Sequence, residues 1–383
     1  MSGNVNSSRH FSLNMHANDC SDRVVFILPQ LPPAHCGLGD YSMILLNHMR
    51  LDPPPRILVM HGASKTNAAH PDLDVEPLPG SSAGLLERLQ ELKAKRVFVQ
   101  YVAQGFQSRG CPLWFLAALC KWRVGTPDAR LVIMFQELWF EPAWWKPDWL
   151  LQKFHRHALR KLVGVVDRIF VSTESFAEMI QGSAAPGRLQ VLMNPATITP
   201  RAPLMEACRE EGHMVLFGLQ GSRLLALNEM APWLGRLHSA GLLAKLWILG
   251  SRKHAAMNER EDCLVRSLLP PGVAEVLGSQ TAEQISQRFL KAEMGIFAKI
   301  SHGYTKSTIF MAYASHGLSI LSPENISKTC APLSYAIHPL DLLEGKITSD
   351  QIENRGQKLA QWYENNASWG RVADTYREAL STS

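Results

Sequence analysis

The sequence predicts an α/β protein made of two doubly wound parallel sheets. Three observations support this prediction. Short apolar segments alternate with amphipathic segments along the chain, which is the pattern of repeated βαβ units. The alternation breaks once, at 194–200, where two prolines within seven residues indicate a linker. The chain has 383 residues, which is enough for two domains.

The first domain is expected over 22–196. Its strands should follow the apolar, β-branched runs, and its helices should follow segments with apolar residues three and four positions apart. The expected strands are 24–28, 57–60, 97–101, 131–135, 169–172 and 190–193, and the helices include 40–49, 85–93 and 113–122. Residues 1–21 are rich in serine, asparagine and histidine and lack an apolar core, so we expect a disordered tail and no signal peptide.

The second domain is expected over 201–366, because the alternation resumes after the linker. The expected strands are 214–217, 245–249, 274–277, 294–298 and 318–321, and the helices are 225–240, 259–269, 283–291 and 309–315. The closing segment, 367–383, contains one more amphipathic helix at 369–380. We expect this helix to cross back and pack on the first domain.

Composition narrows the class of protein. Hydrophobic residues make up 46% of the chain and charged residues 19%, which is ordinary for a soluble globular protein. A net charge of +5 suits an anionic ligand or a membrane surface but is too small to indicate nucleic acid. The seven cysteines are scattered and include no C-x-x-C pair, which indicates reduced thiols in the cytoplasm. The longest apolar run, 111–120, is too short to span a membrane.

The most informative motif is Lys306-Ser307-Thr308, which follows a loop containing Gly303 and opens the expected helix 309–315. Free backbone N–H groups, two hydroxyls and an ammonium at a helix N-terminus form a site for an anion such as a diphosphate. The alternative role of the two hydroxyls is to cap the helix. The motif therefore indicates a nucleotide-type ligand.

Two common nucleotide motifs are absent. A P-loop has glycine directly before its lysine, and Thr305 occupies that place here. A dinucleotide-binding turn has three glycines, but after Gly37 and Gly39 the third place holds Ser42. The second strand also ends at His61 rather than at an acidic residue. These differences disfavour both an ATPase of the P-loop type and an NAD-binding protein.

Two further polar sites lie at the expected carboxyl ends of strands, where ligands bind in α/β proteins. Gln136 and Glu137 end the strand 131–135, and Glu137 is either a catalytic base or the partner of a basic helix. The turn that begins at Gly218 leads to Arg223, which we expect to be a second cation for the anionic ligand.

Taken in order, these segments resemble a GT-B glycosyltransferase of the family 4 group. The matching segments are 29–41, 132–139, 166–173, 216–218, 312–320 and 367–376. The resemblance implies two Rossmann-like domains facing across a cleft, with the acceptor on the first and a nucleotide-diphospho sugar on the second. It implies transfer of the sugar, with retention, to a glycan, a lipid-linked acceptor or a small molecule. No metal and no cofactor beyond the donor are expected.

The resemblance also assigns site residues. Gly37 and Gly39 would approach the acceptor and the donor phosphates, and Asp40 would lie near an acceptor hydroxyl. The alternative for these residues is a strand-to-helix turn with a capping aspartate. The catalytic candidates are Glu137, Asp40 and Gln136, and the leaving phosphate could itself accept the proton.

The sequence departs from the family at three positions. Gln136 replaces the usual histidine, and Tyr304 and Ala312 fall about where a pair of glutamates usually binds the donor. The loop Lys306 to Thr308 would then have to replace these glutamates. Two alternatives stay open: an inactive relative that binds a nucleotide sugar or a partner enzyme, and an epimerase or hydrolase on the same fold.

The segment 139–161 combines many tryptophans with a basic amphipathic stretch. Such a segment stacks on sugars, lies on a membrane surface at the inner face, or forms an ordinary surface helix. Asp72-Leu73-Asp74 is interpreted as a turn rather than a metal site, and His155 and His157 lack a third ligand at metal spacing.

Overall fold

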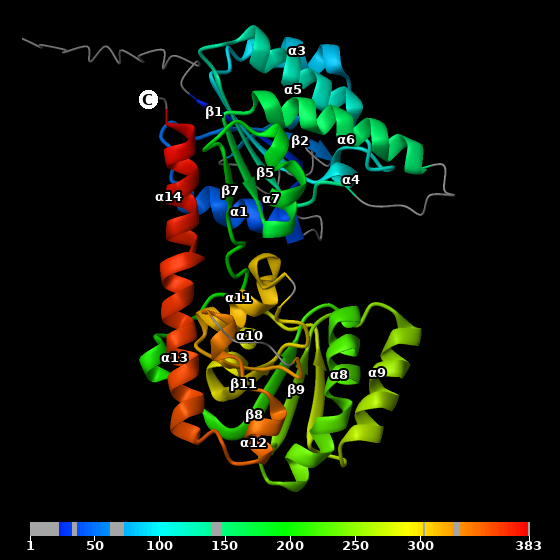
Figure 1. Cartoon of the computed structure of the whole chain (residues 1–383), viewed down its shortest axis with the longest axis vertical. Helices are drawn as coiled ribbons and strands as arrows, with labels where there is room; N and C mark the ends of the chain where they lie inside the picture. Colours follow the sequence, from blue (N-terminus) through cyan, green and yellow to red (C-terminus); the bar gives the residue numbers. More distant parts are fainter. Residues whose placement is uncertain are drawn as a thin grey trace, which may run out of the picture.

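The computed structural model describes residues 23–32, 37–61, 73–139, 148–301, 303–324 and 330–381. It has two parallel sheets, each with helices on both faces, stacked one above the other (Figure 1). This confirms the predicted α/β class. The predicted tail, 1–21, lies outside the described residues. No helix in the described part of the chain has the length and apolar character needed to cross a membrane.

The first sheet has seven parallel strands in the order β3-β2-β1-β4-β5-β6-β7. The chain moves to one side for β2 and β3 and then returns to place β4 beside β1, so the order reverses between β1 and β4. The strands are β1 (Val24–Gln30), β2 (Arg56–His61), β3 (Asp74–Pro77), β4 (Arg96–Tyr101), β5 (Arg130–Phe135), β6 (Arg168–Val171) and β7 (Leu189–Val191).

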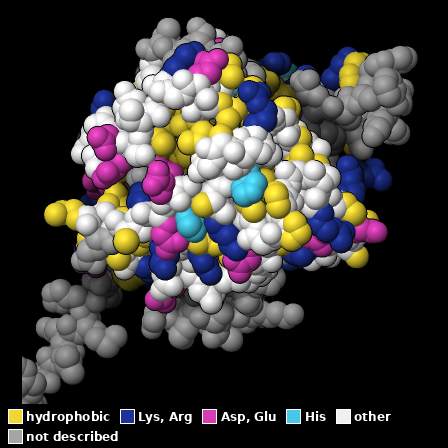
Figure 2. Space-filling model, turned by 90° about the horizontal axis from the view of Figure 1, so that it is seen from below, with side chains coloured by type: hydrophobic (Ala, Val, Ile, Leu, Met, Phe, Trp, Pro, Cys, Tyr) yellow, Lys and Arg dark blue, Asp and Glu magenta, His cyan; other side chains and the backbone are white. Residues whose placement is uncertain are grey.

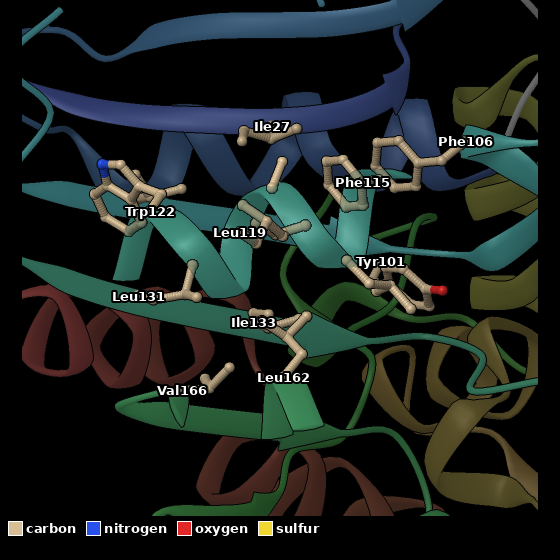
Figure 3. Close-up of a cluster of buried hydrophobic side chains, with 14 of the residues drawn as sticks. Ile27, Tyr101, Phe106, Phe115, Leu119, Trp122, Leu131, Ile133, Leu162 and Val166 are labelled. Atoms are coloured by element: carbon tan, nitrogen blue, oxygen red, sulfur yellow. The ribbon is translucent and has the colours of Figure 1, made fainter. Parts of the chain in front are cut away.

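Helices cover both faces of this sheet. On one face the core contains side chains of α3 (Ser82–Glu91), α5 (Leu113–Gly125) and α6 (Asp148–Val165). Figure 3 shows this cluster, with Phe115, Leu119 and Trp122 of α5 against strand residues such as Ile133. On the other face the core contains side chains of α1 (Gly37–Met49) and α14 (Trp369–Leu380). Two short helices, α4 (Ala103–Phe106) and α7 (Glu174–Ile180), follow β4 and β6.

The second sheet has five parallel strands in the order β10-β9-β8-β11-β12, so its order reverses between β8 and β11. Its strands are β8 (Glu210–Phe217), β9 (Lys245–Leu249), β10 (Ala274–Gly278), β11 (Ala292–Ile296) and β12 (Ser319–Leu321). One face packs against α8 (Gln220–Ser239), α9 (Ala255–Leu268) and α12 (Pro339–Leu343). The other packs against α10 (Ala282–Lys291), α11 (Thr308–Ser315) and α13 (Ser349–Asn366).

Two segments connect the domains, and they meet at Ala196. The linker passes from β7 to the second domain, and the C-terminal segment returns through α13 and α14 along one side of the molecule (Figure 1). The backbone N–H of Ala196 donates to Tyr363 Oη at 3.3 Å, and Trp369 Nε1 donates to the Ala196 carbonyl at 2.7 Å. We call this arrangement the Ala196 joint. It ties the linker to the returning helices.

Candidate functional site

In doubly wound sheets, ligands bind beyond the carboxyl ends of the strands, at the point where the strand order reverses. In the second domain that point lies between β8 and β11, and in the first it lies between β1 and β4. Two cavities lie beyond these strand ends, one at the β8–β11 reversal and one between the domains.

The first cavity, which we call the β8–β11 cavity, has a volume of about 240 Å³. Most of its wall is apolar. The lining residues are Leu216, Phe217, Ser222, Leu225, Ala226, Ile296, Phe297, Ala298, Lys299, Gly303, Ser307 and Ile309. The sequence analysis missed Ser222 and Lys299, although Lys299 comes directly after the expected strand 294–298. Apolar walls beside a few hydroxyls and one ammonium suit a flat, partly polar ligand.

The second cavity, which we call the interdomain cavity, has a volume of about 260 Å³. The first domain supplies Ala103, Gln104, Glu137, Trp139 and Phe176, and the second domain supplies Lys306. The cavity is therefore complete only when both domains are in place.

The loop that carries Lys306 is shaped by its backbone. Gly303 has φ of +86°, a left-handed conformation that favours glycine. A 3₁₀ turn, η4 (Tyr304–Lys306), follows and places Lys306 at the edge of the gap. Ser307 is then the N-cap of α11, because its Oγ accepts the N–H of Phe310 at 3.2 Å. The capping role weighed for this hydroxyl is thus present, and Ser307 also lines the β8–β11 cavity. Thr308 is the first residue of α11.

Lys306 and Glu137 face each other across the interdomain gap. Lys306 Nζ lies 3.3 Å from Glu137 Oε1, and the two side chains are 37% and 53% exposed. The ammonium also lies 5.5 Å from the centre of the Phe176 ring. The structure therefore brings together two residues that the sequence placed at separate sites. A charged pair at this exposure is held weakly, so an anionic ligand can compete for the lysine.

Gln136 lies next to Glu137 but is buried, with 6% of its surface exposed. Its amide forms two reciprocal hydrogen bonds with Asn194, at 3.1 Å and 2.9 Å. The backbone N–H of Asn194 in turn donates to the carbonyl of Thr305 at 2.9 Å. Gln136 was predicted among the catalytic residues, and its amide connects through Asn194 to the loop that carries Lys306. Sequence reasoning missed Asn194, which it treated only as the start of the linker.

Arg223 corrects a prediction. It was expected to offer a second cation to the ligand, but it is fully buried and paired with Glu261, which is also fully buried. Arg223 Nε and Nη2 donate to the two carboxylate oxygens at 2.7 Å and 2.9 Å, and Nη1 donates to the Gly218 carbonyl at 2.7 Å. The guanidinium is therefore not available to bind a ligand, because breaking a buried ion pair would leave an uncompensated charge. Among the described residues that line the β8–β11 cavity, Lys299 is exposed and supplies the cation.

Gly218 brings two elements close together. Its φ is +141°, and a Cβ on it would lie 2.5 Å from Cδ1 of Ile309 on α11. The positive φ favours glycine here, and the absent side chain leaves room for Ile309 beside the turn between β8 and α8. Its carbonyl accepts from Arg223, as described above.

The N-terminus of α1 holds the other predicted residues. Gly39 is buried, and a Cβ on it would lie a tight 3.2 Å from the Gln30 carbonyl, so glycine lets α1 lie close over the end of β1. Gly37 has open space around it. Asp40 is exposed in the first turn and makes no ion pair with another described residue. Residues 33–36 of this loop lie outside the described part of the chain.

The segments examined as metal sites have other roles. Asp74 is not in a turn but begins β3, where it pairs with Arg23 and Arg56 at 3.0 Å and 2.8 Å; Asp72 lies outside the described residues. His155 lies on the buried face of α6, with its Nε2 2.7 Å from Tyr101 Oη. The described residues contain no group of three side chains arranged to hold a metal ion.

Comparison with known proteins establishes the fold. No family model matches this sequence, and no curated protein matches it. Solved structures do match. A glycosyltransferase from Rickettsia africae aligns with a TM-score of 0.62 and 11% identity, over 94% of this chain and 99% of that one. The chain has the GT-B fold.

Two other GT-B structures align equally fully. WaaG, a glycosyltransferase involved in lipopolysaccharide biosynthesis, aligns with a TM-score of 0.60 and 11% identity over 94% of this chain and 100% of that one. HepE from Anabaena, solved with UDP and glucose, aligns with a TM-score of 0.59 and 9% identity over 94% and 99%. The fold inferred from the sequence resemblance is therefore confirmed.

Proposed function

We propose that this GT-B protein is a glycosyltransferase that takes its sugar from a nucleotide-diphospho donor. The observation that carries the proposal is the position of Lys306. Its loop borders the β8–β11 cavity through Gly303 and Ser307, and its ammonium lies at the interdomain cavity 3.3 Å from Glu137. A diphosphate bound at the Lys306 loop would lie between the two cavities. It would join a nucleoside in the β8–β11 cavity to a sugar in the interdomain cavity.

The chemistry follows from this placement. Transfer breaks the bond between C1 of the sugar and the diphosphate oxygen, and forms a bond from C1 to an acceptor hydroxyl. Negative charge grows on the departing diphosphate, and donors already aimed at it stabilise the transition state. Lys306 and the free N–H groups at the start of α11 would supply that stabilisation, and Lys299 would add a second cation.

The acceptor proton has two possible destinations. Glu137 is exposed beside Lys306 and can receive it, or the departing phosphate can receive it directly. Glu137 is the one carboxylate among the described residues that line the interdomain cavity. Retention is what the family resemblance implies, with the departing phosphate accepting the proton on the face from which it leaves. Asp40 is the candidate contact for the acceptor hydroxyl, at the same edge of the first sheet.

A second function is favoured by a specific observation. Gln136, where the family usually has histidine, is bonded to Asn194, and Ala312, near the usual glutamate, is fully buried. A protein that binds a nucleotide sugar or a partner enzyme without transferring sugar would need neither group. The two functions share the donor site and differ in turnover.

The test is a calorimetric titration with UDP, GDP and ADP and with their sugar conjugates. Lys306→Ala should weaken diphosphate binding by about 1.5–3 kcal/mol, or roughly tenfold to a hundredfold, because it removes a charged hydrogen bond. Lys291→Ala is the matched control, since Lys291 is 55% exposed and pairs with Glu210 at 3.5 Å, away from either cavity. Failure of every diphosphate to bind would overturn the proposal.

Turnover separates the two functions. Release of free sugar from the donor that binds, with water as acceptor, should be detectable in the native protein and should fall in Glu137→Gln while binding persists. Binding without any sugar release or transfer would favour the inactive binding protein.

A further inference from the structure

Two neighbouring helices of the first domain expose an unusual share of apolar surface. Half of the exposed large apolar side chains among the described residues lie on α5 and α6: Leu113, Val124, Trp149, Leu150 and Phe154. Figure 1 shows the two helices side by side on the outside of the first domain. Their N-termini are joined, because Cys111 Sγ donates to the Leu151 carbonyl at 3.3 Å and Gln152 Nε2 donates to the Gly110 carbonyl at 3.2 Å.

On α6 the exposed apolar groups share a face with basic ones. Leu150 and Phe154, which are 55% and 56% exposed, are four residues apart. His157 and Lys161 continue the same face one and two turns later, and both are exposed. The N-terminal end also has Lys153 Nζ 3.7 Å from the centre of the Trp149 ring. Apolar residues that adjoin on one helix face form a patch, and such patches mark interaction surfaces more often than isolated exposed residues do.

Basic residues outnumber acidic ones on this surface. The sequence of α5 contains no acidic residue, and that of α6 contains none after Asp148. The far end of the second domain is different, because Figure 2 shows acidic side chains interspersed with lysine and arginine there. Arg123 on α5 is paired with Asp167, but the exposed Lys153 and Lys161 on α6 place positive charge beside the exposed apolar groups.

We propose that this α5–α6 face docks on the surface of a membrane that contains anionic lipid. A helix with exposed tryptophan, phenylalanine and leucine beside lysine and arginine binds at the boundary between headgroups and acyl chains. Each basic residue near an anionic surface adds attraction that salt weakens. The exposed apolar residues also favour a lipid surface over an acidic soluble partner, because such a partner would bind the basic residues alone.

The α5–α6 face is continuous with the interdomain cavity through Trp139. This tryptophan lines the cavity, and the guanidinium carbons of Arg156 and Arg160 on α6 lie 5.2 Å and 5.9 Å from its ring centre. On the proposed function, docking would place the mouth of the cavity beside the membrane. The acceptor class that fits is therefore a lipid-linked hydroxyl compound, presented from the headgroup region.

The test uses the full chain and vesicles of phosphatidylcholine, with or without phosphatidylglycerol, in a sedimentation assay. The native protein should bind the mixed vesicles, and the double variant Leu150→Glu with Phe154→Glu should bind at least about tenfold less. Met205→Glu is the matched control, since Met205 is 98% exposed outside the α5–α6 face, and it should bind like the native protein. No binding by the native protein, or equal binding by the double variant, would overturn the proposal.

A second variant tests the charges. Lys153→Gln with Lys161→Gln should reduce binding to mixed vesicles severalfold, and raised salt should have the same effect on the native protein. An unchanged affinity of this variant for the mixed vesicles would contradict the proposal that the lysines attract the anionic lipid. UDP, GDP and ADP titrations of the same variants should match the native protein, so loss of vesicle binding with an intact donor site can be told apart from failure of the proposed function.

Discussion

His155 and His316 are buried imidazoles, one in each domain. His155 contacts Tyr101 Oη through Nε2, and His316 Nε2 lies 2.9 Å from Ser286 Oγ. Burial lowers the pKa of each of them to about 4, because the charged form loses its hydration. Both imidazoles are therefore neutral in the folded protein at neutral pH.

The two histidines make stability depend on pH. In the unfolded chain each takes a proton below about pH 6.5, while in the folded protein each stays neutral until about pH 4. The unfolded state binds more protons in this window, so the free energy of unfolding should fall as the pH is lowered through it. Each histidine contributes up to about 3 kcal/mol of that loss.

Urea unfolding at a series of pH values measures this dependence. His316→Gln should be less stable than the native protein at pH 7 but should show a shallower fall toward pH 4. His157→Gln, at an exposed position, should keep the native slope. A slope in His316→Gln as steep as in the native protein would contradict the assignment.

Single residues also show where sequence reasoning ends. Lys306 and Glu137 were identified because each follows a strand in a recognisable motif. The amide pair of Gln136 and Asn194 was missed because the two residues are 58 positions apart. Arg223 was misassigned for the same reason, since its partner Glu261 is 38 positions away. A sequence motif shows which kind of side chain is present. The fold decides whether that side chain is free to bind a ligand or is bonded to another residue.

At the scale of elements, α13 is fixed by a very close approach to β12. A Cβ on Gly356 would lie 2.1 Å from the Gly317 carbonyl oxygen, and Ser319 Oγ donates to the Ile352 carbonyl. The helix backbone therefore rests directly on the turn before β12. This contact helps to set where α13 leaves the second domain.

Gly356→Ala should destabilise the protein by about 1–3 kcal/mol, because the added methyl group meets backbone that cannot rotate away. Thermal or urea unfolding measures this. Gly370→Ala on α14 is the matched control, since no atom lies within 4 Å of its Cβ position. That change should be neutral or add up to about 1 kcal/mol, through the better helix propensity of alanine. Equal effects of the two substitutions would show that α13 can shift outward.

The expected strands all formed, because each is a short apolar run, and the longer run at 111–120 entered α5, where a helix was expected. The exceptions have physical causes. The strand β3 reads Asp-Val-Glu-Pro, with one buried apolar residue, so it lacks an apolar run. The helix α13 has an apolar stripe interrupted at Gly356, where the backbone itself makes the packing contact. A helix cannot be predicted from its pattern of apolar side chains at a place where its backbone makes the packing contact, as at Gly356.

At the scale of the whole molecule, the Ala196 joint connects the domains more strongly than the ion pair across the gap. Trp369 is 4% exposed and packs with Tyr41 and Tyr376 in the core of the first domain while bonding the linker carbonyl. The exposed pair of Lys306 and Glu137 contributes about 1 kcal/mol or less. The fold class was predictable from sequence, but this joint was not, because it combines two distant segments.

Trp369→Ala should cost about 3–5 kcal/mol, since it leaves a large cavity and an unpaired carbonyl. Calorimetry should show one unfolding transition for the native protein and two for this variant, with the first domain melting earlier. Trp362→Ala is the control, because Trp362 packs on the second-domain aromatics Tyr304 and Phe310, and should keep the transitions together. A single transition in Trp369→Ala would mean that other contacts couple the domains.

The position of α14 has a consequence for how the protein is made. Only α1 and α14 supply helical side chains to one face of the first sheet in the described structure, and α14 is near the end of the chain. During synthesis the seven strands of that sheet are complete long before α14 leaves the ribosome. At usual rates of translation the delay is on the order of ten to thirty seconds. Throughout that time the part of this face that α14 later buries stays exposed, so the nascent chain presents apolar surface that the finished protein covers.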